Sequence, residues 1–329
     1  MSGKVDVCLY GAGAIGSFYA FILNRVSNVQ LTIIARSNYE AIKANGITLD
    51  SENHGKHLFS PYKVASTPAE AAGHYDYVVC VNKAINQEAV AKSLAPVIDD
   101  TTTIVLIQNG VGNEDPFRAQ FPNSTILSCV TWVGATQTSP GFVKHIASEF
   151  TEIGLFPNPS VSPNIESSRL DNFISLLKAG NTKFAIEDNI QIRRWEKVVW
   201  NVAWNAITSL TQIDTQTWLH SSPDSIPLTK QLMEEVIEVA RKSGVPMREG
   251  LVEELFVKIL ALPGVYTSMQ KDVVARNPLE IDVILGVPVT KARELGVKTP
   301  VLEVIYTLVQ AVDYGIRQGK IFPSISTSV

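Results

Sequence analysis

A glycine-rich turn near the amino terminus constrains the fold of this chain more than any other feature. It reads Gly11-Ala12-Gly13-Ala14-Ile15-Gly16 and directly follows the apolar run Val5–Tyr10. In such a strand–turn–helix unit, the first glycine permits the tight turn, the second lets backbone approach a pyrophosphate, and the third lets the helix pack on the sheet. The start of the helix offers free N–H groups to phosphates. The segment predicts a dinucleotide-binding unit, with a purely structural turn as the alternative.

The rest of the first half alternates short apolar runs with helical patterns, which is typical of a parallel sheet covered by helices. The expected strands are Val5–Tyr10, Val29–Ala35, Tyr75–Val81, Thr103–Gln108 and Ile126–Val133, and the expected helices between them are Ala14–Val26 and Gln87–Val97. The turn Ser139-Pro140-Gly141 and the runs Phe142–Ile146 and Thr151–Leu155 are interpreted as a turn and edge strands that close the domain.

Helical periodicity dominates after Ile190, where strand signals disappear. The expected helices there are Arg193–Leu210, Leu228–Ser243, Glu249–Leu260 and Pro300–Gln318. A helix over about Ile165–Ala179 and a strand near Phe184–Ile186 complete the first half. The sequence therefore predicts an α/β protein: a Rossmann-type parallel-sheet domain over residues 1–188, followed by an all-helical domain over residues 189–329.

Composition excludes several classes of protein. The chain has 329 residues, 45% of them hydrophobic, and a net charge of −4, without the basic stripe that nucleic-acid binding requires. We find no signal peptide and no apolar stretch long enough to cross a membrane. Cys8, Cys80 and Cys129 each lie in an apolar run, which favours reduced core thiols over a disulfide framework. We expect a cytoplasmic protein with no nucleic-acid or membrane partner and no metal site.

The end of the second expected strand indicates which dinucleotide binds. An NAD enzyme usually places Asp or Glu there to hold the ribose hydroxyls, but this chain reads Ile34-Ala35-Arg36-Ser37-Asn38. The planar guanidinium of Arg36 can pair with a 2′-phosphate, and Ser37 or Asn38 can add hydrogen bonds. The pattern favours NADPH (NADP+). The alternative is that Arg36 is a solvated surface arginine.

A polar stripe marks the first helix of the second domain. Lys197, Asn201 and Asn205 are spaced four apart, so in an α-helix they drift only about 80° over two turns. Apolar residues cover much of the rest of this helix. Buried polar groups without partners are costly, and a bound substrate is a good candidate partner. The alternative is that the asparagines bond neighbouring backbone and Lys197 extends to water.

Together with several other short motifs, these features make the sequence resemble the ketopantoate reductase (2-dehydropantoate 2-reductase) family over nearly its whole length. The matching pieces are the Gly11–Gly16 turn with Arg36, Lys83 in Val81-Asn82-Lys83-Ala84, the segment Gln108-Asn109-Gly110-Val111-Gly112, Trp195-Glu196-Lys197 followed by Asn201 and Asn205, Ser268-Met269, and Glu280-Ile281-Asp282. Their order and spacing together make the resemblance specific.

The resemblance implies a role for each matching residue. Lys197 is expected to be the general acid that protonates the keto oxygen as hydride arrives from NADPH, with Glu280 as its charged partner. The expected substrate-binding residues are Asn201, Asn205, Ser268 and Asn109. The expected cofactor-binding residues are Gly11, Ala12, Gly13, Ala14, Ile15, Gly16, Arg36, Lys83 and Asn109. The resemblance also implies a C-terminal domain like that of 6-phosphogluconate dehydrogenase, an active site in a cleft, and a homodimer.

Departures from the family pattern fall mainly at the substrate end. The family commonly has glutamine where this chain has Asn86, proline at Ala206 and asparagine at Leu285, and some members have asparagine at Thr215. The leading hypothesis is NADPH-dependent reduction of 2-dehydropantoate to pantoate, a step toward pantothenate and coenzyme A. A paralogue that reduces another 2-oxo acid or activated ketone is the first alternative, and a non-catalytic NADPH sensor is the second.

Overall fold

The structure, a computed structural model, describes residues 3–320, and the chain divides into two compact units. The first unit contains the chain up to Gln108 together with Asn113–Ile190. The second contains Asn109–Gly112 together with the chain from Gln191 onward. Four residues that follow a strand of the first unit therefore belong to the helical unit.

The first unit is built on an eight-stranded sheet. Its strands are β1 (Val5–Tyr10), β2 (Val29–Ile34), β5 (Lys63–Ala65), β6 (Tyr77–Cys80), β7 (Thr103–Ile107), β8 (Thr125–Thr131), β11 (Thr151–Phe156) and β12 (Phe184–Ile186). The strand order is β12-β11-β8-β7-β6-β1-β2-β5. Neighbouring strands are parallel except for β11, which runs antiparallel to β8. The predicted Rossmann-type parallel sheet is confirmed.

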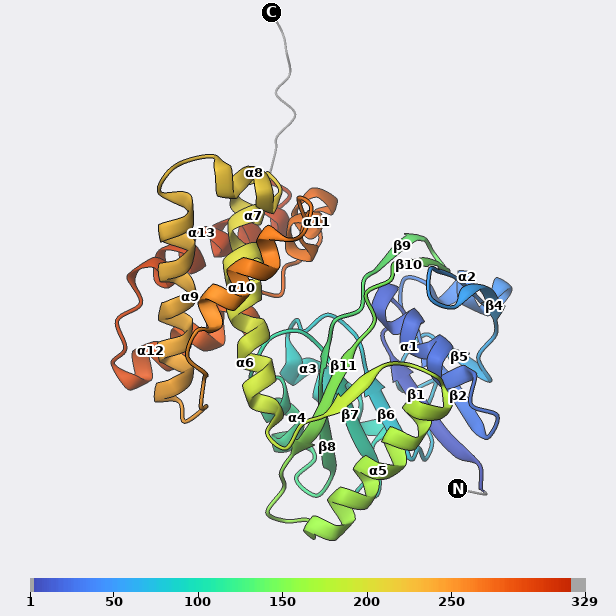
Figure 1. Cartoon of the computed structure of the whole chain (residues 1–329). Helices are drawn as coiled ribbons and strands as arrows, with labels where there is room; N and C mark the ends of the chain where they lie inside the picture. The colour runs from blue at the N-terminus through green and yellow to red at the C-terminus, as the bar shows by residue number, and fades with distance from the viewer. Residues whose placement is uncertain (1–2, 321–329) are drawn as a thin grey trace, which may run out of the picture. The chain divides into compact units, whose positions relative to one another are not determined.

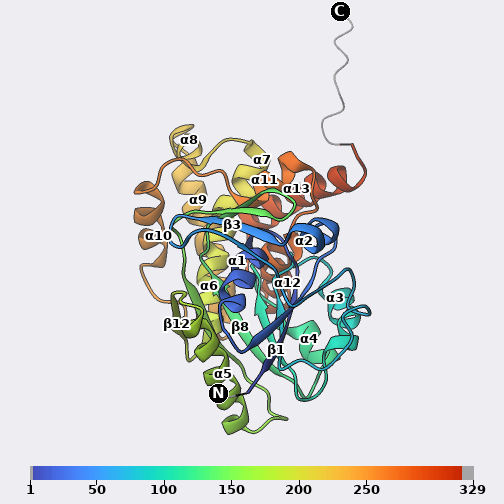
Figure 2. The same cartoon turned by 90° about the vertical axis from the view of Figure 1, so that its right-hand side faces the viewer.

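Helices cover both faces of this sheet because the inner strands are apolar on both sides. Val7 and Leu9 of β1 pack in one cluster with α1 (Ala14–Asn24) and α5 (Pro163–Ala179). Cys8 points the other way and joins the cluster beneath three other helices, which are α3 (Gln87–Ser93), η1 (Ala95–Val97) and α4 (Glu114–Gln120). Figure 2 shows α3 and α4 on one side of the sheet and α5 on the other.

A second, four-stranded sheet packs on α1 and was not predicted. Its strands are β3 (Ile47–Ser51), β4 (Gly55–Phe59), β9 (Ala135–Ser139) and β10 (Phe142–His145), in the order β4-β3-β10-β9. In Figure 1 the β9–β10 hairpin lies beside α1 and α2 (Tyr39–Asn45). The interpretation of Phe142–Ile146 and Thr151–Leu155 as edge strands is wrong, because β10 is an inner strand of this second sheet and β11 is an inner strand of the main one.

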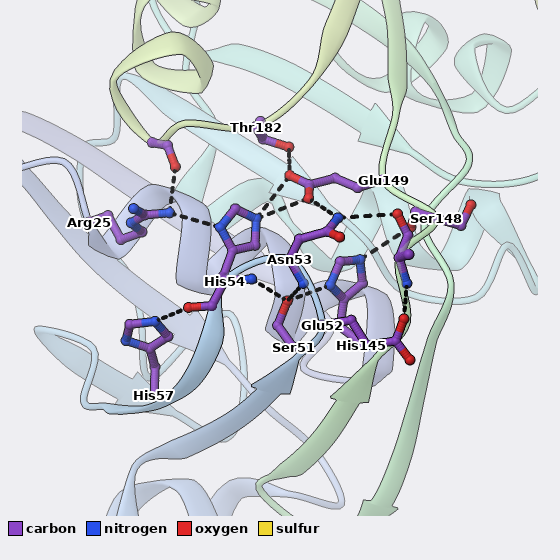
Figure 3. A network of polar contacts seen from close by, with 12 residues as sticks. Arg25, Ser51, Glu52, Asn53, His54, His57, His145, Ser148, Glu149 and Thr182 are labelled. Carbon is purple, nitrogen blue, oxygen red and sulfur yellow. Dashed lines mark hydrogen bonds and ion pairs between the residues drawn. The ribbon is translucent and has the colours of Figure 1, made fainter.

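Figure 3 shows the polar network that joins the second sheet to the β11–β12 side of the main sheet. The carboxylate of Glu149 accepts three side-chain hydrogen bonds, from Asn53 Nδ2 at 2.8 Å, Thr182 Oγ1 at 2.8 Å and His54 Nε2 at 3.0 Å. Burial alone would raise the pKa of Glu149, but these hydrogen bonds outweigh it and lower the pKa. Burial lowers the pKa of His145 in the same network. The network thus holds a carboxylate and a neutral imidazole at neutral pH.

The three cysteines are buried thiols, as predicted. Cys8 and Cys80 lie in neighbouring strands of the main sheet, and Cys129 lies in β8. Burial raises the pKa of the Cys8 thiol to about 12 and raises that of Cys80 as well. A thiolate is the reactive form of cysteine, so neither residue has the character of a nucleophile.

The second unit consists of helices, as predicted. Within the described residues they are α6 (Ile190–Asn201), the π-helical segment η2 (Val202–Ala206), α7 (Ile207–Thr211), α8 (Thr215–His220), α9 (Ser225–Lys242), α10 (Leu251–Leu260), α11 (Ser268–Ala275), the π-helical segment η3 (Asp282–Gly286), α12 (Val287–Leu295) and α13 (Pro300–Arg317). Between residues 3 and 320, no helix combines the length and apolar character that a bilayer crossing demands.

Candidate active site

The glycine-rich turn has the geometry that its sequence predicts. Gly11 has φ +105°, and a Cβ there would lie 2.5 Å from the Asn82 nitrogen. A Cβ on Gly16 would lie 1.8 Å from the carbonyl oxygen of Gly11, so the helix can approach the turn only with glycine at that position. A Cβ on Gly13, in contrast, would meet no atom within 4 Å. The middle glycine therefore faces open space, which fits a pyrophosphate bound at the start of α1.

Three predicted cofactor-binding segments meet at the carboxyl edge of the main sheet. Tyr10, at the end of β1, lies opposite Ile34 in β2 and opposite Cys80 in β6. The glycine-rich turn, Arg36 and Lys83 follow these three strand ends. The guanidinium of Arg36 is exposed and makes no hydrogen bond or ion pair with any residue that the structure describes. This edge is where doubly wound sheets bind nucleotides, and the exposed cation is accessible to a phosphate.

Asn38 has a structural role that differs from the predicted one. Its Nδ2 donates to the Ala12 carbonyl at 2.6 Å and to Gln137 Oε1 at 2.9 Å, and its Oδ1 accepts from Gln137 Nε2 at 3.0 Å. Both hydrogens of the amide are therefore used within the protein. Of the two residues expected to add a hydrogen bond to the cofactor, Asn38 therefore has no amide hydrogen left to donate, and the role of Ser37 stays a prediction. Asn38 holds the glycine-rich turn instead.

A buried network of amides supports the same edge and was missed by the sequence analysis. Gln108 Nε2 donates to the Asn82 carbonyl at 3.0 Å, and Gln87 Nε2 donates to Gln108 Oε1 at 2.7 Å and to Asn113 Oδ1 at 3.3 Å. Asn86, which replaces a family glutamine, is exposed and caps α3 through a hydrogen bond from the Ala89 N–H. The two neighbouring amide side chains thus have different roles: Asn86 caps α3, and Gln87 belongs to the buried amide network.

In the second unit, the predicted polar stripe lies on a helix that is not purely α-helical. Lys197 and Asn201 belong to α6, but Asn205 lies in η2, where backbone bonding is π-helical. A π-helix is wound more loosely than 3.6 residues per turn, so the segment rotates Asn205 back toward the line of the other two. The side chain of Lys197 is half-buried, and Asn201 and Asn205 are each 5% exposed. Asn201 Nδ2 is buried and has no hydrogen-bond partner among residues 3–320.

Hydroxyl groups link the stripe to the segment that carries Ser268. Thr208 Oγ1 donates to the Trp204 carbonyl at 2.7 Å and lies 2.8 Å from Thr267 Oγ1. Thr267 in turn caps α11 by accepting the Gln270 N–H at 3.3 Å. Ser268 follows Thr267 directly and is exposed at the start of α11. The predicted substrate-binding Ser268 is thereby fixed to the helix that carries Asn205.

The loop Asn109–Gly112 is also fixed to this helical unit. The Val111 N–H donates to the Val283 carbonyl at 2.9 Å, and Arg194 Nη1 donates to the Gly110 carbonyl at 3.0 Å. Val283 lies in η3, and the residue five positions later is Pro288, which has no N–H to offer that carbonyl. Arg194 is only 1% exposed and precedes Lys197 by about one helical turn. Asn109 therefore lies in a loop that two hydrogen bonds attach to the helices of this unit.

Glu280 lies two residues before η3, and it is half-buried. The neighbouring Leu279 N–H donates to Asp313 Oδ1 at 2.9 Å, and Asp313 Oδ2 accepts from Arg317 Nε at 2.5 Å. These bonds fix the backbone next to Glu280. Its pairing with Lys197 stays a prediction.

Three of the residues that depart from the family pattern, Thr215, Leu285 and Ala206, are buried. Thr215 is fully buried, and its Oγ1 accepts the Val265 N–H at 3.1 Å, three residues before Ser268. Leu285 and Ala206 are fully buried in η3 and η2. Thr215 therefore helps to place the Ser268 segment, and neither Leu285 nor Ala206 offers a polar group.

Comparisons with known proteins agree over most of the chain. The model described as "Ketopantoate reductase PanE/ApbA" matches residues 7–158, and the one described as "Ketopantoate reductase PanE/ApbA C terminal" matches residues 189–313. The chain is 25% identical to an uncharacterized protein of Saccharomyces cerevisiae, with 95% of each covered. It is similar to the solved 2-dehydropantoate 2-reductase from Methylococcus capsulatus (30% identity, TM-score 0.84, 95% of this chain and 98% of that chain). It shares its fold with a D-mandelate dehydrogenase solved with NADH and anilino(oxo)acetate (20% identity, TM-score 0.83, 95% and 100% covered).

The family matches cover the unit with the glycine-rich turn and the unit with the lysine helix. The resemblance stated from the Gly11–Gly16 turn, the lysine helix and the Glu280 segment is confirmed. This chain belongs to the ketopantoate reductase family, a family of oxidoreductases.

Proposed function

We propose that this protein reduces 2-dehydropantoate to pantoate with NADPH in the cytoplasm, on the route to pantothenate and coenzyme A. Bound NADPH supplies the hydride. Lys197 donates a proton to the keto oxygen of the substrate, where negative charge develops as the hydride arrives, so the ammonium group lowers the barrier. The expected homodimer stays a prediction.

The main support for a substrate site beside Lys197 is the buried side-chain amide of Asn201. Its Nδ2 is buried, finds no partner in the part of the chain that the structure describes, and lies one helical turn beyond Lys197. A buried donor with no acceptor costs about 1–3 kcal/mol, and a substrate oxygen that accepts this bond removes the cost. The position is therefore suited to a ligand with oxygen acceptors, such as a hydroxylated 2-oxo acid.

The remaining roles follow from the positions of the other residues. We assign the substrate carboxylate to Ser268 at the exposed start of α11, and hydrogen bonds with the substrate to Asn205 and Asn109. Glu280 is assigned as the charged partner of Lys197. The Gly11–Gly16 turn is assigned to the pyrophosphate, Arg36 to the 2′-phosphate, and Lys83 and Asn109 to further cofactor contacts.

Initial rates with NADPH and a panel of 2-oxo acids test this function. The panel contains 2-dehydropantoate, pyruvate, 2-oxoisovalerate and phenylglyoxylate, which differ in size and in hydroxyl content. We expect the highest kcat/KM with 2-dehydropantoate. A higher kcat/KM with another member would contradict the assigned substrate, and a lack of NADPH oxidation with every member would favour the non-catalytic sensor.

A second candidate function is the reduction of a different 2-oxo acid by the same chemistry. The fully buried Leu285, and Thr215 with its hydroxyl bonded to Val265, favour this alternative. Leu285 stands where the family usually has asparagine, and Thr215 stands where some members have it, so these positions lack the amide groups that such members carry. In the panel, this candidate predicts that phenylglyoxylate or 2-oxoisovalerate, which lack the hydroxyl of 2-dehydropantoate, give the highest kcat/KM.

The choice of cofactor is tested by Arg36→Ala. We expect this substitution to lower kcat/KM for NADPH by about tenfold or more, because a charge-assisted hydrogen bond contributes about 1.5–3 kcal/mol. The kcat/KM for NADH should change little, since NADH has no 2′-phosphate. Lys56→Ala, which removes another exposed cation of the same unit, serves as the control. Equal losses with both cofactors would count against the assignment of Arg36.

A further inference from the structure

Asn38 occupies the N-cap position of α2 but does not cap that helix. Asparagine is among the best N-cap residues, and its side-chain bond to the first turn typically stabilises a helix. Here the Asn38 amide instead donates to the Ala12 carbonyl, 26 residues earlier, at 2.6 Å. The residue is 7% exposed, so this short bond lies in the interior. The side chain therefore links the start of α2 to the glycine-rich turn at the expense of local capping.

Gln137 holds the Asn38 amide in place, and the Ala12 carbonyl fixes which way round that amide lies. Gln137 lies in β9 of the second sheet, and the two side chains exchange hydrogen bonds of 2.9 and 3.0 Å. The other hydrogen of Asn38 Nδ2 is directed to Ala12. A rotated amide would place Oδ1 against the Ala12 carbonyl, and two acceptors repel each other. With Gln137 present, every hydrogen-bonding group of the Asn38 amide has a partner in one orientation.

This pair lies between the two segments assigned to the phosphates of NADPH. Asn38 follows Arg36 by two residues, and Ala12 belongs to the glycine-rich turn. The Gly11 N–H also donates to the Ile34 carbonyl at 3.1 Å, so the end of β2 is attached to the turn at two points. The second attachment is a main-chain bond. The bond from Asn38 to Ala12 is made by a side chain, and that side chain is also hydrogen-bonded to Gln137, 99 positions away.

We propose that Gln137 is a positioning residue for the cofactor. Through Asn38 it sets the spacing between Arg36 and the glycine-rich turn, and thereby the preference for NADPH over NADH. Gln137 acts without touching the cofactor itself. The proposal rests on the proposed use of NADPH and adds a specificity role for the second sheet. It predicts that a substitution in β9 changes the discrimination between two cofactors that differ only in the 2′-phosphate.

Dissociation constants for NADPH and NADH, measured by fluorescence titration of the full chain, test this proposal. Gln137→Leu removes both bonds to Asn38. We expect it to raise the Kd for NADPH by about fivefold or more, because displacement of Arg36 would weaken its bonds to the 2′-phosphate and one lost hydrogen bond corresponds to a factor of roughly five. The Kd for NADH should rise by less than about twofold. Gln137→Glu should act in the same direction, because a carboxylate oxygen would then face Asn38 Oδ1. Thr136→Val, on the opposite face of β9, is the matched control and should change neither Kd.

A double-mutant cycle with Arg36→Ala separates positioning from general support of the fold. In the Arg36→Ala background, Gln137→Leu should no longer change the ratio of the two dissociation constants. The proposal is overturned if both Gln137 variants leave that ratio within about twofold of the wild-type value, or if they weaken both cofactors equally. A wild-type protein that binds NADH as tightly as NADPH would overturn the proposed cofactor, and this role of Gln137 with it. A wild-type preference for NADPH that both variants retain overturns only the role of Gln137.

Discussion

Lys197→Ala is expected to lower kcat by about a hundredfold or more, as the loss of a general acid does. The lysine lies one helical turn before the buried, unpaired amide of Asn201, on the same helix. Without its ammonium group, the charge that develops on the keto oxygen would have to be neutralised by water. The Kd for NADPH should change little, because the residues assigned to the cofactor phosphates lie in the other unit. Steady-state kinetics and a cofactor titration measure the two effects separately.

Two further measurements define the role of Lys197. Lys242→Ala removes an exposed lysine at the end of α9 and should leave kcat within about twofold of the wild-type value. Added alkylamines should partly restore the activity of Lys197→Ala, since a small ammonium ion can replace the missing proton donor. Near-normal turnover by the alanine variant would remove Lys197 from the mechanism.

The nucleotide-binding core could be predicted because its signals are local. The strand β1, the glycine-rich turn and α1 are contiguous, and each glycine has a steric reason that the structure reproduces at Gly11 and Gly16. The apolar runs at β7 and β8 are buried on both faces, so their composition alone indicates an inner strand. Family membership then followed from the order of short motifs.

The second sheet could not be predicted, because its pairing is not local. Its β3 strand pairs with β10, although almost a hundred residues separate them in the chain. The β4 strand is exposed along most of its length, so it lacks an alternating apolar pattern. Asn38 was misinterpreted for the same reason. Its partner Gln137 lies in that sheet, and no residue near Asn38 in the sequence indicates this contact.

The π-helical segments also could not be predicted, because the interpretation of the polar stripe assumed an α-helix with 3.6 residues per turn. The relative placement of Lys197, Asn201 and Asn205 was therefore approximate. One physical clue was available at η3, where Pro288 removes an N–H from the following turn. At η2 the clue is weaker: Thr208 and Ser209 donate their hydroxyls to the carbonyls of Trp204 and Asn205.

Gly110→Ala is expected to lower kcat/KM by more than about tenfold, because the loop that carries Asn109 cannot accommodate a side chain there. Gly110 has φ +91°, and an added Cβ would lie 2.5 Å from both the Cβ and the carbonyl oxygen of Val283. The loop would have to move away from η3, which would break the Val111–Val283 and Arg194–Gly110 bonds. Backbone strain of about 1–3 kcal/mol and the loss of buried hydrogen bonds act together. Kinetics and thermal unfolding of the variant measure the result.

Gly296→Ala is the matched control for this substitution. Gly296 has a similar positive φ of +68°, but a Cβ there would meet no atom within 4 Å. It therefore introduces the same kind of backbone strain without the collision, and it lies at the end of α12, where no role in the reaction is assigned. We expect Gly296→Ala to lower Tm by a few degrees and to leave kcat/KM near the wild-type value. If Gly110→Ala behaves in the same way, the position of Asn109 does not depend on the close approach of the loop to Val283, and Asn109 loses its assigned place in the reaction.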